Sequence, residues 1–185
     1  MKVLFLGPTS SPLRQWLVDQ GEYVVGTAAP ITPGFVVCNN FDFLISYGYR
    51  YILSKDILDL LPNRAVNLHI ALLPWNRGAD PNLWSFIEDT PKGVTIHYLD
   101  EGIDTGDIIV QREMVFEAPG ETLATPYQKL QSEIQGLFKK FWFLIKTGTC
   151  PRTKQVGCGS FHRSRDKAAI TLLEGWDTSI GYYHS

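Results

Sequence analysis

A strand followed at once by a capped helix opens the chain and restricts the folds that it can adopt. Residues 1–7 (MKVLFLG) are almost continuously apolar, which is typical of a strand that is covered on both faces. The next residues lead into a helix, for which Ser11 is the expected N-cap, Pro12 the first helical residue and Gly21 the residue just beyond the end. This order of strand, loop and helix predicts an α/β fold with a doubly wound, mainly parallel sheet.

The loop between this strand and this helix gives little support to a nucleotide site. It contains neither G-x-G-x-x-G nor the Gly-Lys pair of a P-loop, as dinucleotide and nucleoside-triphosphate sites require. Thr9 and Ser10 nevertheless precede a helix N-terminus, where backbone N–H groups can hold an anion. Such a loop is equally often only a turn, so both interpretations stay open.

Further strands are predicted over residues 23–28, 65–69, 93–99 and 108–116. Asn67 and His69 are two residues apart, so both side chains should leave the same face of their strand, while Val66 and Leu68 pack behind it. The connection between the last two strands is short, which favours an antiparallel pair. The sheet is therefore expected to be mainly parallel with an antiparallel strand.

Asn67, His69 and the acidic residues 100–107 (DEGIDTGD) form a set that suits attack on a carbonyl carbon. An amide and an imidazolium can both donate to a developing oxyanion, and a carboxylate beside the imidazole keeps it protonated and can relay protons. No Ser or Cys among these residues stands at a strand-to-helix elbow, so a covalent acyl-enzyme is not indicated. We therefore expect acyl transfer directly between two bound substrates.

Taken singly, these residues also have structural explanations. An Asn at a strand end is more often a turn former, and a lone His in a strand is more often a hydrogen-bonded structural residue. The acidic run is compatible with a solvated turn, but a calcium loop is unlikely because the alternating acids and final Glu of an EF-hand are missing. His97 has no matched role and is interpreted as structural.

The segment from Asn67 to Gly106 resembles the catalytic half of the formyltransferases that use 10-formyltetrahydrofolate. The motifs that carry the resemblance are, in order, Asn67-x-His69, Leu72-Leu73-Pro74, Arg77-Gly78, Gly93-Val94-Thr95-Ile96-His97 and Gly102-Ile103-Asp104-Thr105-Gly106. That family includes glycinamide ribonucleotide, methionyl-tRNA and amino-sugar formyltransferases. The resemblance implies a Rossmann-like fold in a single catalytic domain, residues 1–185, with an irregular extension from about residue 150. It also implies that Asn67, His69 and Asp104 are the catalytic trio.

The resemblance further implies where the two substrates bind. The co-substrate 10-formyltetrahydrofolate is expected against the aromatic loop that follows a strand and against the turn that leads to Asp104. The residues expected there are Tyr47, Gly48, Tyr49, Arg50, Tyr51, Ile52, Leu53, Leu99, Asp100, Glu101 and Ile103. The small-molecule amine is expected at Thr9, Ser10, Trp75, Arg77 and Gly78.

The choice of amine follows from what the sequence lacks relative to the family. A chain of 185 residues is too short for the RNA-binding domain of the methionyl-tRNA enzymes, and the Gly-Ser-Asn signature of the glycinamide ribonucleotide enzymes is missing after Gly7. The first half is also abbreviated. A nucleotide-linked amino sugar is the expected substrate. The alternatives are a glycinamide ribonucleotide formyltransferase, a formyl-folate hydrolase, and a folate-binding protein that has lost activity.

Composition excludes several other functions and suggests a location. With 17 Lys and Arg against 19 Asp and Glu, the chain has no basic field for nucleic acid or anionic membrane. Cys38, Cys150 and Cys158 make no disulfide framework and no secretory signal precedes them, so reduced thiols and a cytoplasmic location are expected. Cys150, Cys158 and His162 lack the spacing of zinc ligands, so no metal site is expected.

A long amphipathic helix is predicted to run from a capping box at Thr125 to Gly148. Lysines interrupt its apolar end, so it is not a membrane span. Trp142 and Phe143 lie off its main apolar stripe and are expected to meet the C-terminal tail or to form an interface. In the second case Trp142 would pack on a symmetry mate in a homodimer.

Overall fold

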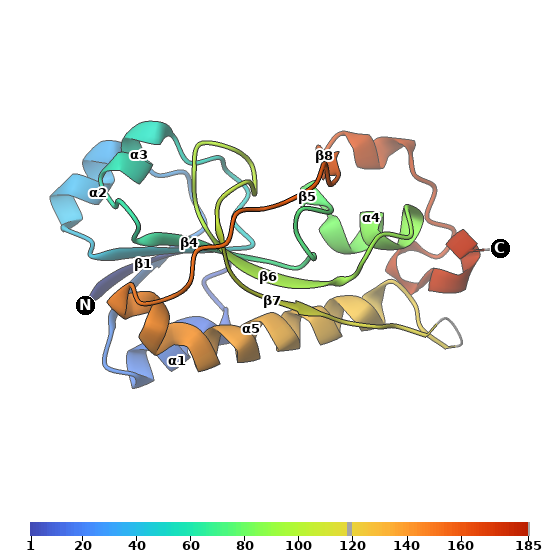
Figure 1. Ribbon diagram of the computed structural model, residues 1–185, viewed down its shortest axis with the longest axis horizontal. Coiled ribbons are helices and arrows are strands. Elements are labelled where there is room, and N and C mark those ends of the chain that lie inside the picture. The colour runs from blue at the N-terminus through green and yellow to red at the C-terminus, as the bar shows by residue number, and fades with distance from the viewer. Residues whose placement is uncertain (118–119, 185) are drawn as a thin grey trace.

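The computed structural model describes residues 1–117 and 120–184, and its centre is a six-stranded mixed sheet (Figure 1). The strands follow one another in space as β2 (Tyr23–Thr27), β1 (Lys2–Leu6), β3 (Phe43–Tyr47), β4 (Ala65–His69), β6 (Gly93–Tyr98) and β7 (Ile108–Glu113). The first four strands of this order are parallel, β6 is antiparallel to β4, and β7 is antiparallel to β6. The predicted α/β class with a mainly parallel sheet and an antiparallel strand is confirmed.

Helices cover both faces of this sheet, as Figure 1 shows. One face carries α1 (Pro12–Asp19) and α5 (Ala124–Thr147), and the other carries α2 (Pro33–Asn39) and α3 (Lys55–Asp59). The remaining elements are α4 (Pro81–Ile87), a two-stranded sheet of β5 (Arg77–Gly78) and β8 (Phe161–His162), and the 3-10 helices η1 (Asp166–Ala169), η2 (Gly175–Asp177) and η3 (Ile180–His184).

Strand β4 has one apolar and one polar face, and this places the catalytic candidates. Val66 and Leu68 belong to the core cluster between the sheet and α5. Asn67 and His69 alternate with them and therefore face the opposite side. The prediction that Val66 and Leu68 pack behind the polar pair is confirmed.

The predicted capping box at Thr125 is wrong, because α5 begins at Ala124 and its N-cap is Leu123. Leu123 is fully buried in a cluster with Leu83, Phe86 and Ile180, and its carbonyl accepts a 3.0 Å hydrogen bond from Asn82. This tertiary packing fixes the start of the helix and overrides the local signal. The predicted end is correct, since Gly148 is the C-cap with a left-handed φ of 71°.

Both expectations for Trp142 are wrong. Its indole is buried in the core between Phe43 and Phe138, at ring-centroid distances of 5.5 and 5.3 Å, and its Nε1 lies 3.3 Å from Oε1 of Glu22. It packs neither on the tail nor on an external surface, so it provides no basis for a dimer. Trp142 in fact belongs to the buried stripe of α5, because it follows Phe138 by four residues and precedes Ile145 by three. Phe143, by contrast, is 67% exposed.

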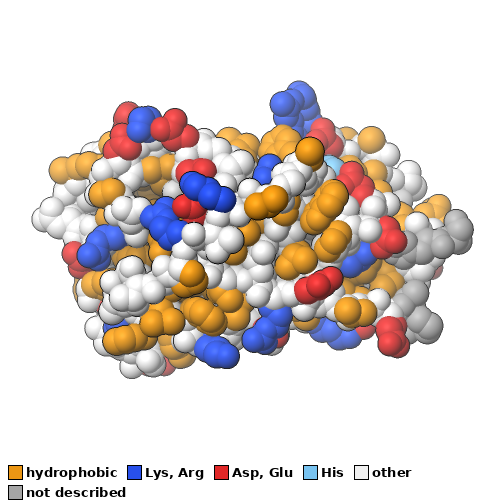
Figure 2. All heavy atoms as spheres, in the orientation of Figure 1, with side chains coloured by type: hydrophobic (Ala, Val, Ile, Leu, Met, Phe, Trp, Pro, Cys, Tyr) orange, Lys and Arg blue, Asp and Glu red, His pale blue; other side chains and the backbone are white. Residues whose placement is uncertain are grey.

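The chain after α5 returns across the sheet and then reaches β8 (Figure 1). Thr153 pairs with Ile108 as an isolated bridge, and β8 pairs in parallel with β5. Among the described residues no helix is long and apolar enough to cross a membrane. Figure 2 shows basic and acidic side chains interspersed over one face, in keeping with the nearly balanced charge.

Candidate active site

Strands β4 and β6 bring four polar side chains to one face of the sheet. In their antiparallel register Asn67 lies opposite His97, and His69 lies opposite Thr95. Val94, Ile96 and Tyr98 of β6 pack in the core under α5, so Thr95 and His97 share the face of Asn67 and His69. All of these polar residues except Asn67 are classed as buried. The candidate site is thus built on rigid strands.

Asp104 enters this site from the loop between β6 and β7. Its Oδ1 accepts a 2.9 Å hydrogen bond from Asn67 Nδ2 and lies 3.3 Å from His97 Nε2. Its Oδ2 accepts a 2.8 Å bond from the backbone N–H of Gly78 and lies 3.6 Å from His69 Nδ1. The convergence of amide, imidazole and carboxylate that the sequence suggested is present in the structure.

The charge of Asp104 is strongly stabilised where it lies. Only 11% of its side chain is exposed, and burial alone would raise the pKa of this carboxyl. The neighbouring imidazoles of His69 and His97 outweigh burial and hold the pKa well below its usual range. Asp104 is therefore a carboxylate at neutral pH and acts as the negative centre of the site.

The hydrogen bonds of the two imidazoles assign their protons. His69 Nε2 lies 2.9 Å from the carbonyl oxygen of Asn76, which can only accept, so Nε2 carries a hydrogen. Its Nδ1 then faces Asp104. His97 Nδ1 lies 2.8 Å from the carbonyl oxygen of Tyr98 and must likewise donate, which leaves Nε2 toward Asp104 and Asn67.

The interpretation of His97 as a structural residue missed its place in this cluster. Its imidazole is fully buried, and its Nε2 is 3.3 Å from both Asp104 Oδ1 and Asn67 Nδ2. The strand pairing could have indicated that His97 is part of the site, because an antiparallel β4–β6 pair puts residue 97 opposite residue 67. The order of the strands in the sheet was needed to read it.

The loop after β4 is fastened by side chains on β6 and in the tail. Thr95 Oγ1 donates to the carbonyl of Ala71 at 2.7 Å and accepts from the Leu73 N–H at 3.1 Å. Further along, the Asn76 N–H donates to Ser160 Oγ at 2.9 Å. These bonds hold the carbonyl of Asn76 against His69.

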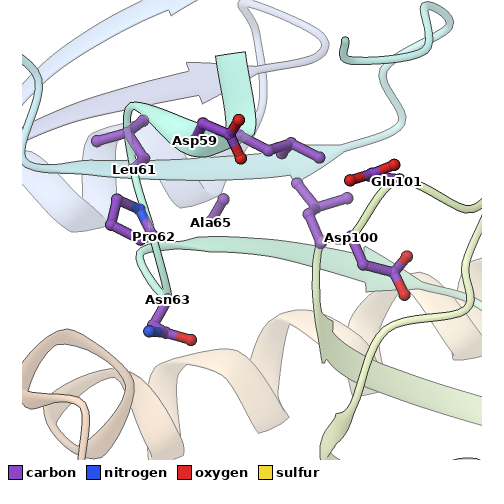
Figure 3. A pocket seen from close by; sticks show the side chains of 9 residues that line it. Asp59, Leu61, Pro62, Asn63, Ala65, Asp100 and Glu101 are labelled. Atoms are coloured by element: carbon purple, nitrogen blue, oxygen red, sulfur yellow. The ribbon is translucent and has the colours of Figure 1, made fainter. Parts of the chain in front are cut away.

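A pocket of about 410 Å³ opens at the start of β4, beside the first residues of the β6–β7 loop (Figure 3). Three of its lining residues were expected at the folate: Leu99, Asp100 and Glu101. The others, which the sequence reasoning missed, come from α3 and the turn after it: Leu58, Asp59, Leu61, Pro62, Asn63 and Ala65. The missed residues carry no motif, and only the packing of α3 against residues 99–101 makes them a wall.

The loop expected to embrace the folate, residues 47–53, does not line this pocket. The phenol of Tyr47 points into the core toward α5, where Gln135 Nε2 lies 3.1 Å from its oxygen, and burial raises its pKa to about 12. Its side chain is thus on the opposite face from Asn67. Gly48 has a left-handed φ of 68° and Tyr49 donates to the carbonyl of Ala29 at 2.9 Å.

The rest of that expected surface is more open. Arg50, Tyr51 and Ile52 are exposed, the last to 74%, and Leu53 packs at the edge of the core under α3. Ile103, next to Asp104, is 37% exposed. These residues border the sheet edge without forming an enclosed cavity.

The expected amine site divides into two groups. Gly78 touches Asp104 directly, Arg77 is one residue away, and the neighbouring Trp75 is 37% exposed. Thr9 and Ser10 are exposed after β1, at the edge of the sheet where the parallel strands β1, β3 and β4 end. The structure thus brings Arg77 and Gly78 to the trio and leaves Thr9 and Ser10 further along the same edge.

Gln155 is a member of the site that the sequence reasoning missed entirely. Its Nε2 donates to the carbonyls of Asp104 and Gly106, at 2.8 and 2.9 Å. Its Oε1 accepts from Arg77. No periodicity or motif marks residues 151–158, so the sequence carried no signal for it. Among the described residues no group of three or more His, Cys, Asp and Glu side chains is placed to hold a metal ion.

Comparison with known proteins gives a consistent picture. The sequence profile of the formyl transferase family matches residues 36–140. The crystal structure of the formyltransferase PseJ from Anoxybacillus kamchatkensis, in complex with UDP-4,6-dideoxy-4-formamido-L-AltNAc and tetrahydrofolate, is 47% identical, with a TM-score of 0.94 over 99% of this chain and 97% of that one. A 4-N formyltransferase from Francisella tularensis, 24% identical with a TM-score of 0.80 over 94% of this chain and 81% of that one, shares the fold.

Curated relatives include methionyl-tRNA formyltransferases. That of Agathobacter rectalis is 39% identical over 136 residues, which are 73% of this chain and 44% of the relative. That of Ruminiclostridium cellulolyticum is 29% identical over 178 residues, or 94% of this chain and 56% of the relative. The chain therefore spans about half the length of the curated relatives it matches.

Proposed function

This chain belongs to the formyl transferase family, and we propose that it moves a formyl group from 10-formyltetrahydrofolate to the primary amine of a nucleotide-linked amino sugar. The observation that carries the proposal is the cluster of Asn67, His69 and Asp104, fixed on two strands and one anchored loop. It provides donors and a carboxylate at the place where the formyl carbon would be attacked. The transfer is direct, because no nucleophilic side chain stands in the cluster.

The chemistry follows from the positions of the donors. A neutral amine attacks the formyl carbon, and negative charge then develops on the formyl oxygen. Asn67 Nδ2 carries two hydrogens, of which one goes to Asp104 and the other faces His97 Nε2 at 3.3 Å; donation to the formyl oxygen would replace this longer second contact. His69 is the second donor, because its Nε2 carries a hydrogen while its Nδ1 faces Asp104. A shift of Nε2–H from the Asn76 carbonyl toward the substrate completes the oxyanion site.

Asp104 also serves the proton balance of the reaction. The attacking amine loses a proton as the carbon–nitrogen bond forms, and the departing folate nitrogen gains one as its bond to the formyl carbon breaks. A carboxylate in contact with an imidazolium can accept the first proton and return it, directly or through a water. Because its charge is strongly stabilised, Asp104 would pass such a proton on rather than keep it.

The pocket behind the β6–β7 loop supports a flat co-substrate. Its lining combines the apolar residues Leu58, Leu61 and Leu99 with the polar residues Asp59, Asn63, Asp100 and Glu101, as an aromatic ring with polar atoms around its rim requires. A volume of about 410 Å³ lies in the range of small-molecule sites. We place the pterin there, with the formyl group directed toward Asp104.

The substrate class rests on similarity. PseJ, crystallised with a UDP-linked formamido sugar, is 47% identical to this chain with a TM-score of 0.94, whereas the two methionyl-tRNA formyltransferases are 39% and 29% identical over their matched residues. This favours a sugar nucleotide over a tRNA. Methionyl-tRNA is the second candidate, because the curated relatives carry that activity in their names.

One experiment separates the possibilities. The protein is incubated with 10-formyltetrahydrofolate and, in parallel, with UDP-linked amino sugars, dTDP-linked amino sugars, glycinamide ribonucleotide, methionyl-tRNA or no amine. Mass spectrometry then looks for the gain of one formyl group. We expect a gain on a sugar nucleotide. A gain only on methionyl-tRNA or glycinamide ribonucleotide would overturn the substrate class, and release of formate without amine would indicate a hydrolase. Folate binding without turnover would indicate a binding protein.

A further inference from the structure

We propose that Gln155 is a positioning residue that sets the orientation of Asp104, so that the segment after α5 completes the active site. The inference rests on the proposed function, because it concerns the carboxylate of that reaction. No substrate contact is assigned to Gln155. It acts through the backbone of the β6–β7 loop and through Arg77.

The side-chain amide of Gln155 has all of its hydrogen-bonding groups engaged. Nε2 donates one hydrogen to the carbonyl of Asp104 at 2.8 Å and the other to the carbonyl of Gly106 at 2.9 Å. Oε1 accepts from Nε and Nη2 of Arg77, at 3.1 and 2.9 Å. One amide therefore links the loop that carries the carboxylate to the strand whose N–H binds that carboxylate.

Asp104 needs such a link because its backbone is in an unfavourable conformation. Its φ is +54°, in the left-handed region that non-glycine residues seldom adopt. The carbonyl of the same residue points to Gln155 while its carboxylate points to Asn67 and Gly78. If the residue turned about its Cα–C bond relative to the following peptide, its carboxylate would move away from Asn67 and Gly78. A bond to that carbonyl is therefore a direct restraint on the side chain.

Gln155 itself is held from both sides. Thr153 exchanges backbone hydrogen bonds of 2.8 and 3.0 Å with Ile108. After Gln155 in the chain, Gly159 packs closely against the loop that follows β4. A Cβ at Gly159 would be 2.0 Å from the carbonyl oxygen of Pro74. Residues 151–154 and 156–158 are exposed and Gln155 is half-buried, so it is the least exposed side chain of this crossing segment. Its placement between two anchors gives the amide a defined position.

The inference predicts a loss in rate rather than in binding. Gln155→Ala removes all four bonds, and freed rotation of the loop should lower kcat by roughly 10- to 100-fold, as loss of supporting hydrogen bonds does elsewhere. KM for the folate should change by less than about threefold, because Gln155 lines no part of the folate pocket. Gln155→Glu is the sharper change, since it keeps the shape but turns oxygen toward two carbonyl oxygens. It should be at least as slow as the alanine variant.

The test uses the full chain and two readouts. Steady-state formyl transfer is measured for wild type, Gln155→Ala, Gln155→Glu and the control Gln128→Ala, an exposed glutamine on α5. Hydrogen–deuterium exchange is followed in peptides that cover residues 100–107. We expect lower kcat and faster exchange in that segment for both Gln155 variants, with the control and the exchange of β1 and β3 unchanged.

The outcomes separate this inference from the proposed function. If wild type turns over and the kcat of Gln155→Glu is within twofold of the wild-type kcat, the positioning role is overturned. Unchanged hydrogen–deuterium exchange in residues 100–107 of the Gln155 variants would also overturn it. A uniform rise in exchange across the whole sheet would also overturn it, because the residue would then be needed for the fold as a whole. If wild type transfers no formyl group, the proposed function fails, and local exchange alone decides whether Gln155 anchors the loop.

Discussion

Replacing Asp104 with Asn changes one atom of the side chain and leaves its size intact, so its effect can be worked out from the contacts. The carboxylate now accepts from Asn67 Nδ2 through one oxygen and from the Gly78 N–H through the other. An amide has a single oxygen. Whichever way it turns, its NH₂ group meets a donor, at 2.9 Å on one side or 2.8 Å on the other.

Two magnitudes follow. One charge-assisted hydrogen bond is lost and a buried donor is left facing another, which should lower stability by about 1–3 kcal/mol. The rate effect is larger, because the negative partner of His69 disappears and with it the proton acceptor. Loss of general acid–base help is worth roughly 10²–10⁴ in rate, or about 3–5 kcal/mol in the barrier. Folate affinity should stay within a few-fold, because the pocket walls are untouched.

The assay is formyl transfer to the amine, followed by mass spectrometry, together with isothermal titration of 5-formyltetrahydrofolate. Asp19→Asn on α1 is the control, since that carboxylate accepts from Gln15 on the face of the sheet opposite the trio. Near-normal kcat in folded Asp104→Asn would refute the assigned role. Acid titration adds a signed check. A folded-state pKa below the unfolded value of about 3.9 stabilises the protein above that pH, so the stability gap to the variant should narrow as the pH falls below about 4.

Three further changes test other parts of the structure. Asn67→Ala removes one oxyanion donor and should lower kcat by roughly 10²–10³, and a loss of less than about threefold would show that the donor lies elsewhere. Leu58→Ala removes an apolar wall of the pocket and should weaken 5-formyltetrahydrofolate binding by about 1–2 kcal/mol, whereas Ile52→Ala should leave it unchanged; the reverse order in titration would place the folate along residues 47–53. The Glu22 side chain is only about 3% exposed and pairs with Lys146, so Glu22→Gln leaves the Lys146 ammonium facing an uncharged amide. The free energy of unfolding measured by urea titration should fall by roughly 2–4 kcal/mol. An unchanged value would show that this ion pair does not stabilise the protein.

The sequence was most informative where side chains alternate along buried strands. In β4 the apolar Val66 and Leu68 alternate with the polar Asn67 and His69. This alternation alone predicts which face of the strand carries the polar side chains, whatever the neighbouring strands are. The short connection between β6 and β7 likewise fixes their antiparallel pairing. These are local properties, and local reasoning recovered them.

The sequence was least informative where partners are distant and carry no pattern. His97 belongs to the candidate site because it lies opposite Asn67, and this position can be predicted only if the order of the strands in the sheet is known. Trp142 stands at helical spacing from Ile134 and Phe138, but only the placement of α5 over Phe43 of β3 shows what buries it. The pocket in which we propose the folate binds forms where α3 meets residues 99–101, and neither segment carries a motif that predicts it. In each case tertiary packing decided what local pattern left open.

The link between Arg77 and Gln155 also bears on the order in which the molecule is assembled. These two residues are 78 positions apart, and Gln155 follows every strand of the main sheet and α5 in the chain. During synthesis the sheet can therefore pair before the Asp104 loop has its anchor. Closing so long a loop adds an entropic cost that grows slowly with its length. We therefore expect that a nascent chain can pair most of its sheet before the residues around Gln155 have left the ribosome, and that the Asp104 carboxylate is aligned only afterwards.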